Sequence, residues 1–151
     1  MTADRTMSHG AVPAYPERPT IDWDRPPTEL SDLVDWFERI SYGLVILETY
    51  SLDQIRSAVD RFESAVRHHT EHTTLPPVRG PADRLGIVLR ADHRWFSQSF
   101  DQLRWFLGLV EQDDHGGNRQ ALGQFGRLVT ESVRRHLADE QQYVRPPTEN
   151  P

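Results

Sequence analysis

The residues with the clearest chemical potential are a histidine and an acid near the C-terminal end of the chain. His136 and Glu140 stand four residues apart. Side chains with that spacing share one face of a helix, with Cβ atoms about 5–6 Å apart, so both can bind one cation. They continue an apolar stripe, where a carboxylate is costly unless it is paired or bound to a cation. The pair therefore predicts a metal site on the inner face of a helix.

An earlier segment has nearly the same order of residues. Four residues recur at constant spacing, namely Glu63, Ser64, Arg67 and His68 as Glu131, Ser132, Arg135 and His136. In this alignment His72 matches Glu140. Two copies of a helix with ligands four residues apart suggest a duplicated helical hairpin that holds a metal between its halves.

The predicted metal ligands come from three segments that should meet in space. His93 lies between Leu89 and Phe96 on a third apolar stripe, so it is expected to point inward. A single histidine on such a stripe is more often a hydrogen-bonded core residue, but five of the seven histidines lie in these segments. The predicted set is His68, His72, His93, His136 and Glu140. His69 is an alternative to His68, because the spacing points both inward, and the alignment favours His68.

The chain has no cysteine. This excludes disulfides, thiolate metal sites, iron–sulfur clusters and cysteine nucleophiles. A site of imidazole and carboxylate suits iron and tolerates zinc, manganese or copper. The expected cofactor is therefore one or two iron ions, with zinc or manganese less favoured.

Four segments have the apolar spacing of helices. They run from about 28 to 50, 51 to 75, 85 to 110 and 118 to 144, and short connections join them. Ser51 and Gln54 form a capping-box pattern that separates the first two. The pattern predicts an all-α, up-down-up-down four-helix bundle over residues 28–146. Residues 1–27 are Pro-rich and predict a flexible or loosely docked arm, and residues 147–151 form a tail.

Net charge and the length of the apolar runs limit which partners the protein is expected to bind. A chain of 151 residues with a net charge of −6 and no long basic cluster is not expected to bind nucleic acid. The longest aliphatic run, Leu44–Leu47, is too short to cross a bilayer, and the N-terminus has no apolar signal core. A cytoplasmic location without membrane contact is the default expectation, and no protein partner can be named.

At the ligand residues the chain resembles the hemerythrin-like, HHE cation-binding family. Asp92-His93, the His136/Glu140 pair and the nearby Pro146 match the second half of that family's motif. The resemblance covers roughly residues 28–146. It implies duplicated two-helix units in a bundle and non-haem iron. Expected activities are binding or sensing of dioxygen or nitric oxide, iron sensing, or oxidase chemistry.

The chain departs from the family pattern in two places. His72 stands where a bridging glutamate is expected, and Val34 stands where the first helix should supply a histidine. The acids near Val34 that could substitute for that histidine are Asp32, Asp35 and Glu38. The ligand set could therefore hold one metal or an uneven pair.

Three functions remain open from the sequence. The first is a non-haem iron protein that binds, senses or reacts with a small diatomic ligand beside Phe96 and Phe100. The second is a metal-free helical bundle that serves as a protein-interaction module. The third is a mononuclear zinc or iron enzyme similar to the DinB type. The sequence identifies no catalytic residue. If the non-haem iron protein of the first hypothesis is an enzyme, it would be an iron-dependent oxidase or oxygenase.

Overall fold

The structure is a computed structural model that describes residues 20–144. Within them lie four helices and no strand: α1 (Leu30–Val45), α2 (Leu52–His72), α3 (Arg84–Gln112) and α4 (Gly116–Val144). The all-α prediction is confirmed. The predicted features within 1–19 and 145–151, including most of the arm, Pro146 and the tail, lie outside the described residues.

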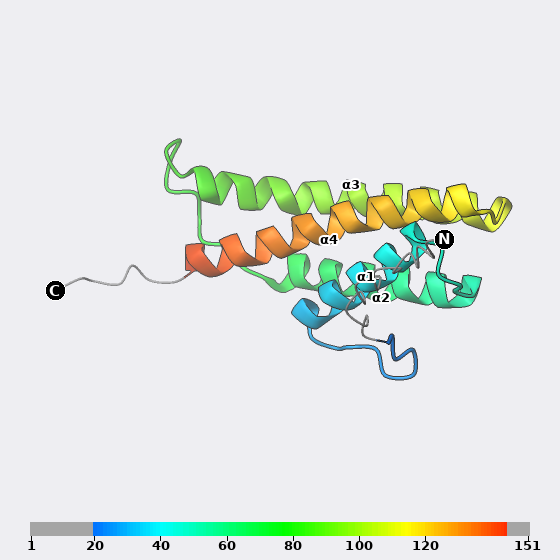
Figure 1. Cartoon of the computed structure of the whole chain (residues 1–151). Coiled ribbons are helices and arrows are strands. Elements are labelled where there is room, and N and C mark those ends of the chain that lie inside the picture. The colour runs from blue at the N-terminus through cyan, green and yellow to red at the C-terminus, as the bar shows by residue number, and fades with distance from the viewer. Residues whose placement is uncertain (1–19, 145–151) are drawn as a thin grey trace, which may run out of the picture.

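The helices form an up-down-up-down bundle, as the sequence predicted. Successive helices run in opposite directions, and α3 and α4 are closest near the turn that joins them (Figure 1). α4 packs against α1 and α3, and α2 packs against the same two helices. None of the helices in residues 20–144 combines the length and the apolar character needed to cross a membrane.

Aromatic side chains fill the centre of the bundle. The rings of Phe37 and Phe62 stack with centroids 4.4 Å apart, and Phe100 meets Phe62 edge-on at 5.7 Å. All three are almost fully buried. Each buried side chain of this size contributes roughly 1.5–3 kcal/mol through removal of apolar surface from water, so this cluster joins α1, α2 and α3.

The predicted boundary between α1 and α2 is partly right. The capping box is present. The backbone N–H of Gln54 donates to Ser51 Oγ, and the backbone N–H of Ser51 donates to Gln54 Oε1. The first helix, expected to end near Tyr50, ends at Val45. Leu47 has a φ of 60°, and the Glu48 amide donates back to the Gly43 carbonyl at 2.8 Å. A left-handed residue with this bond is a Schellman ending, which stops the helix early.

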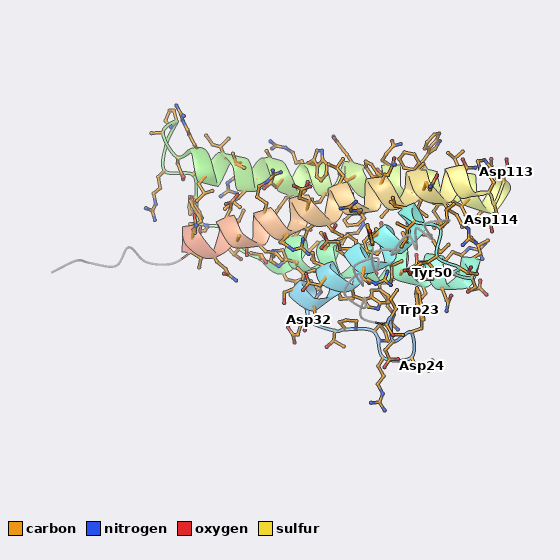
Figure 2. All side chains as sticks on the ribbon, viewed as in Figure 1. Trp23, Asp24, Asp32, Tyr50, Asp113 and Asp114 are labelled. Carbon is orange, nitrogen blue, oxygen red and sulfur yellow. The ribbon has the colours of Figure 1, made fainter. Side chains whose placement is uncertain are left out.

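The described part of the N-terminal arm lies against the bundle. The Trp23 ring meets Trp36 edge-on at 5.9 Å and Tyr50 at 5.4 Å. Figure 2 shows Trp23 beside Tyr50. Because the apolar ring finds partners on α1 and on the α1–α2 connection, the segment just before α1 is docked.

Candidate metal centre

Four donor side chains from three helices converge. His69 of α2, His93 of α3 and His136 and Glu140 of α4 each place one donor atom within 4.8 Å of the others. His69 Nε2 and His136 Nε2 lie 2.9 and 3.1 Å from Glu140 Oε2, and His93 Nε2 lies 3.0 Å from His136 Nε2. Of residues 20–144, these alone form a group of three or more donors suited to a metal.

Helical spacing explains why the donors meet. On α4, Val129, Val133 and His136 follow one another at steps of four and three residues, and all are buried. Phe62, Val66 and His69 follow the same steps on α2. Steps of four and three keep side chains on one face of a helix. The apolar residues of each helix therefore bury its face and bring the next histidine to the same end of the bundle.

His136 is the central member of the group. Its side chain is 0% exposed, and the Phe96 ring meets it edge-on at 5.2 Å. Its Nδ1 lies 3.0 Å from Asp92 Oδ2, so Nδ1–H donates to the carboxylate. In a neutral ring this leaves a lone pair on Nε2, which faces the Glu140 carboxylate. Two acceptors at that distance need a proton or a cation between them, and this arrangement fits a metal ion.

Electrostatics favour the metal-binding form of His93. Burial lowers the pKa of His93 below its usual value, and the neighbouring His136 lowers it further, while Glu140 acts in the opposite direction. A lowered pKa keeps the imidazole neutral near pH 7. Only the neutral ring has the lone pair that binds a metal.

The structure brings together three of the five predicted ligands, His93, His136 and Glu140. His68 and His72 lie outside the group on an exposed face of α2, with their rings stacked at 4.0 Å. The His72 ring nitrogen Nδ1 is bonded to the His68 carbonyl at 2.8 Å. His69 takes the place predicted for His68. The repeat alignment that favoured His68 is one residue out of phase with the packing. The spacing from Val66 left both histidines open, and the structure selects His69.

Sequence reasoning missed two residues that support the ligands. It noted Asp92 only as part of a motif, although its carboxylate holds His136. Thr73 Oγ1 lies 3.3 Å from His69 Nδ1. Thr73 caps the C-terminal end of α2 and follows His69 by four residues, as Glu140 follows His136. The Asp92–His136 contact crosses from α3 to α4, so it leaves no periodic signal in the sequence. Thr73 lies only four residues after His69, and that spacing was the signal that could have identified it.

Helix α1 brings no donor to the core. Its buried residues include Val34, at the position where a family histidine was expected, and none of them is histidine or an acid. Of the acids considered as replacements, Asp32 is exposed, and Asp35 and Glu38 form surface ion pairs with Arg134. These acids therefore do not reach the four-donor group.

The donor set matches one divalent cation. Three neutral imidazoles and one carboxylate supply three nitrogen ligands and one negative charge, which iron, zinc and manganese all accept.

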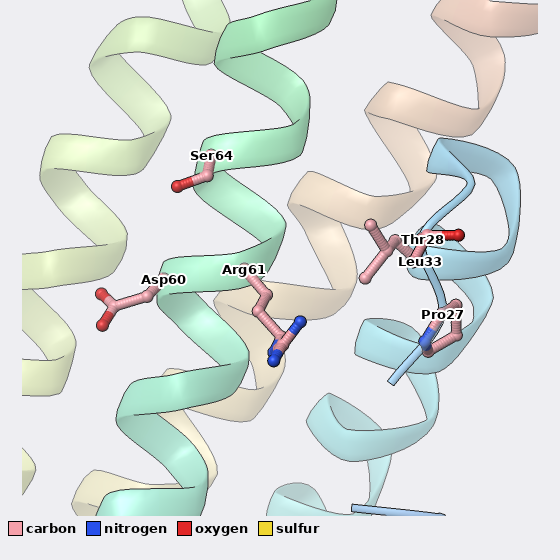
Figure 3. A pocket seen from close by; sticks show the side chains of 6 residues that line it. All are labelled: Pro27, Thr28, Leu33, Asp60, Arg61 and Ser64. Carbon is pink, nitrogen blue, oxygen red and sulfur yellow. The ribbon is translucent and has the colours of Figure 1, made fainter. Parts of the chain in front are cut away.

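A separate cavity lies between the start of α1 and the middle of α2, where Leu33, Asp60 and Arg61 are among its lining residues (Figure 3). None of the four donors lines it, so it is separate from the four-donor group.

Comparison of the chain with protein-family models, with curated proteins and with solved structures gives no match. The fold and site therefore define a class only in structural terms: an all-α bundle with three histidines and one glutamate gathered between α2, α3 and α4.

Proposed function

We propose that the protein binds a single divalent transition-metal ion through four side chains, His69, His93, His136 and Glu140. Iron is the favoured metal. The observation that carries the proposal is the convergence of four donor atoms from three helices within 4.8 Å. The short contact between the Glu140 carboxylate and the Nε2 atom of His136 supports it, because a cation would relieve it.

The donor positions support one ion better than two. A second ion would need further ligands, and the buried face of α1 offers Val34 and other residues that do not bind metals. Thr73, which follows the end of α2, comes four residues after His69 as Glu140 comes four residues after His136, and it is not a bridging carboxylate. We therefore favour a mononuclear centre over the diiron pair of the hemerythrin-like pattern.

We further propose that the ligand of this centre is a small diatomic molecule such as dioxygen or nitric oxide. Four protein ligands leave room in the coordination sphere of iron, and iron supplies the site at which such molecules coordinate. The apolar wall beside His136 supports this choice, because Phe96 is 2% exposed and packs against that ring. The resemblance to the hemerythrin-like family, which rests on short motifs, points the same way.

A mononuclear metal-dependent enzyme of the DinB type is the second candidate. Its support is the presence of three histidines among the four donors, since zinc enzymes commonly hold their metal with three protein ligands. The metal would lower the pKa of a bound water and so supply a nucleophile. The four donor side chains would hold the ion.

Metal analysis of the purified protein tests the proposal. After expression in iron-supplemented medium we expect about one metal ion per chain, because the four donors form one site. His69→Ala should reduce the content to a small fraction of an equivalent, since it removes one of the four donors. The double variant His68→Ala/His72→Ala is the matched control, because both residues lie outside the group, and it should keep the wild-type content.

The other outcomes decide between the alternatives. About two irons per chain with near-ultraviolet oxo-bridge bands would replace the mononuclear centre with a diiron one. A bound ion whose optical spectrum does not change with dioxygen or nitric oxide would favour the enzyme. A folded protein that takes up no metal would contradict the proposal and favour the interaction module. Loss of metal from the double variant, with His69→Ala unaffected, would mean that the ligands are misassigned.

A further inference from the structure

The three histidines of the group differ in what holds their second ring nitrogen. His136 Nδ1 is bonded to the Asp92 carboxylate at 3.0 Å. His69 Nδ1 has the Thr73 hydroxyl at 3.3 Å. For His93, the hydrogen bond found among residues 20–144 is the one to His136 itself. The ligands are thus supported to very different degrees.

We propose that Asp92 is the positioning residue of the metal centre and makes His136 its anchoring ligand. This inference rests on the proposed metal site. By accepting the Nδ1–H of His136, the carboxylate selects the tautomer whose Nε2 lone pair faces Glu140 and His93. A hydrogen bond to a carboxylate also makes the ring a stronger metal donor.

The contact is stronger than the one that supports His69. Hydrogen bonds with an ionised partner are roughly twice as strong as those between neutral groups. The Thr73 hydroxyl is neutral, and its 3.3 Å distance to His69 Nδ1 is long for a hydrogen bond that involves a hydroxyl. Asp92 should therefore matter more to metal affinity than Thr73.

Asp92 is placed to hold a rigid geometry. It belongs to α3 and His136 to α4, so the bond connects two helices that pack together. His136 is fully buried while the Asp92 side chain is 25% exposed. The carboxylate therefore stays partly in contact with solvent while it reaches a buried ring. Asp92 is not one of the four donors, and we assign it no contact with the ion.

Zinc titration against a chromophoric chelator tests this role. Asp92→Ala should raise the dissociation constant for Zn²⁺ about 10- to 100-fold, the loss typical when a ligand's outer partner is removed. Asp92→Glu keeps the carboxylate and should recover most of that loss. Thr73→Val, the matched control, should change the affinity by less than about threefold, because only a long neutral contact disappears.

Either of two titration results would overturn the proposal: an Asp92→Ala affinity within about threefold of the wild type, or an equal loss in Thr73→Val. Circular dichroism checks that the variants keep their helix content. If Asp92→Ala does not fold, Asp92→Asn takes its place, because it keeps the shape and removes the charge.

Ring nitrogen-15 NMR of the wild-type protein tests the same point without a variant. In the metal-free protein above neutral pH, and in the zinc-loaded protein, His136 should carry its proton on Nδ1. A proton on Nε2 would overturn the proposed role of Asp92. A wild-type protein that binds no zinc but shows the Nδ1–H tautomer would contradict the proposed function and leave the positioning contact intact.

Discussion

At the scale of single residues, the angular position of a side chain on α2 decides which histidine joins the four-donor group. Consecutive residues on a helix are separated by about 100° around its axis. Val66 is buried and His69, three residues later, returns to nearly the same face, whereas His68 is exposed. A shift of one residue therefore separates a candidate ligand from a surface histidine.

The burial of His93 predicts a pH dependence of stability in the metal-free protein. Its pKa is lowered in the folded state, so the unfolded chain binds a proton more readily. The contribution of the neutral His93 ring to the free energy of unfolding is complete above the pKa of the unfolded chain, about 6.5. It is lost as the pH falls through the lower pKa of the folded protein. Urea unfolding of the wild type and of His93→Gln, at a series of pH values, measures this effect.

The comparison with the glutamine variant isolates His93 from other groups. The unfolding free energy of the wild type minus that of His93→Gln should decrease as the pH falls below about 6.5. A difference that stays constant or increases on acidification would show that the folded pKa of His93 is not lowered. The measurement needs metal-free protein, because a bound ion would itself oppose protonation.

At the scale of helices, two glycines on α4 let it approach α1 closely. A Cβ added to Gly123 would overlap the Ser41 carbonyl oxygen, and one added to Gly126 would overlap the Ser41 side chain. A Cβ added to Gly108 on α3 would meet no atom within 4 Å. Close approach of α1 and α4 keeps α4, which carries two of the donors, tightly packed in the bundle.

Alanine at Gly123 and alanine at Gly108 should change the stability of the fold in opposite directions. Gly123→Ala should lower the free energy of unfolding by about 1–3 kcal/mol, because the added methyl group meets backbone that cannot move alone. Gly108→Ala should raise it by about 0.5–1 kcal/mol, because alanine restricts the unfolded chain and fits the helix. Chemical denaturation measures both. A stabilising Gly123→Ala would contradict the close contact between α1 and α4.

At the scale of the whole molecule, the segment before α1 extends the core. Trp23 packs edge-on against Trp36 and Tyr50. The Tyr50 hydroxyl donates to Glu48 at 2.5 Å, and burial together with this bond raises the pKa of Tyr50 well above its usual value. The docked segment thus covers the place where α1 ends and the chain turns toward α2.

Removing the Trp23 ring should weaken the whole fold. Trp23→Ala should cost about 1–3 kcal/mol of unfolding free energy, from lost apolar burial and two aromatic contacts. Asp24→Ala is the control. Asp24 is exposed and lies farther from the bundle in Figure 2, so its effect should stay within about 0.5 kcal/mol. Equal stability of Trp23→Ala and the wild type would show that the segment is not docked in solution.

Much of the architecture is local information, so the sequence alone determined it. Apolar residues at steps of three and four predict four helices, and the Ser51 and Gln54 pattern predicts the start of α2, because both depend on neighbours within one or two turns. The same spacing predicted that His93, His136 and Glu140 would lie inside the bundle. The early end of α1 was missed because a left-handed leucine at 47 is not a common helix stop.

Only the tertiary structure decided which side chains meet. The choice of His69 over His68 depends on the rotation of α2 in the bundle, and the role of Asp92 depends on a histidine that lies on another helix. The docking of Trp23 likewise needs partners from two other segments. Such contacts follow from how helices pack against one another, whereas spacing within one helix reports only its own buried face.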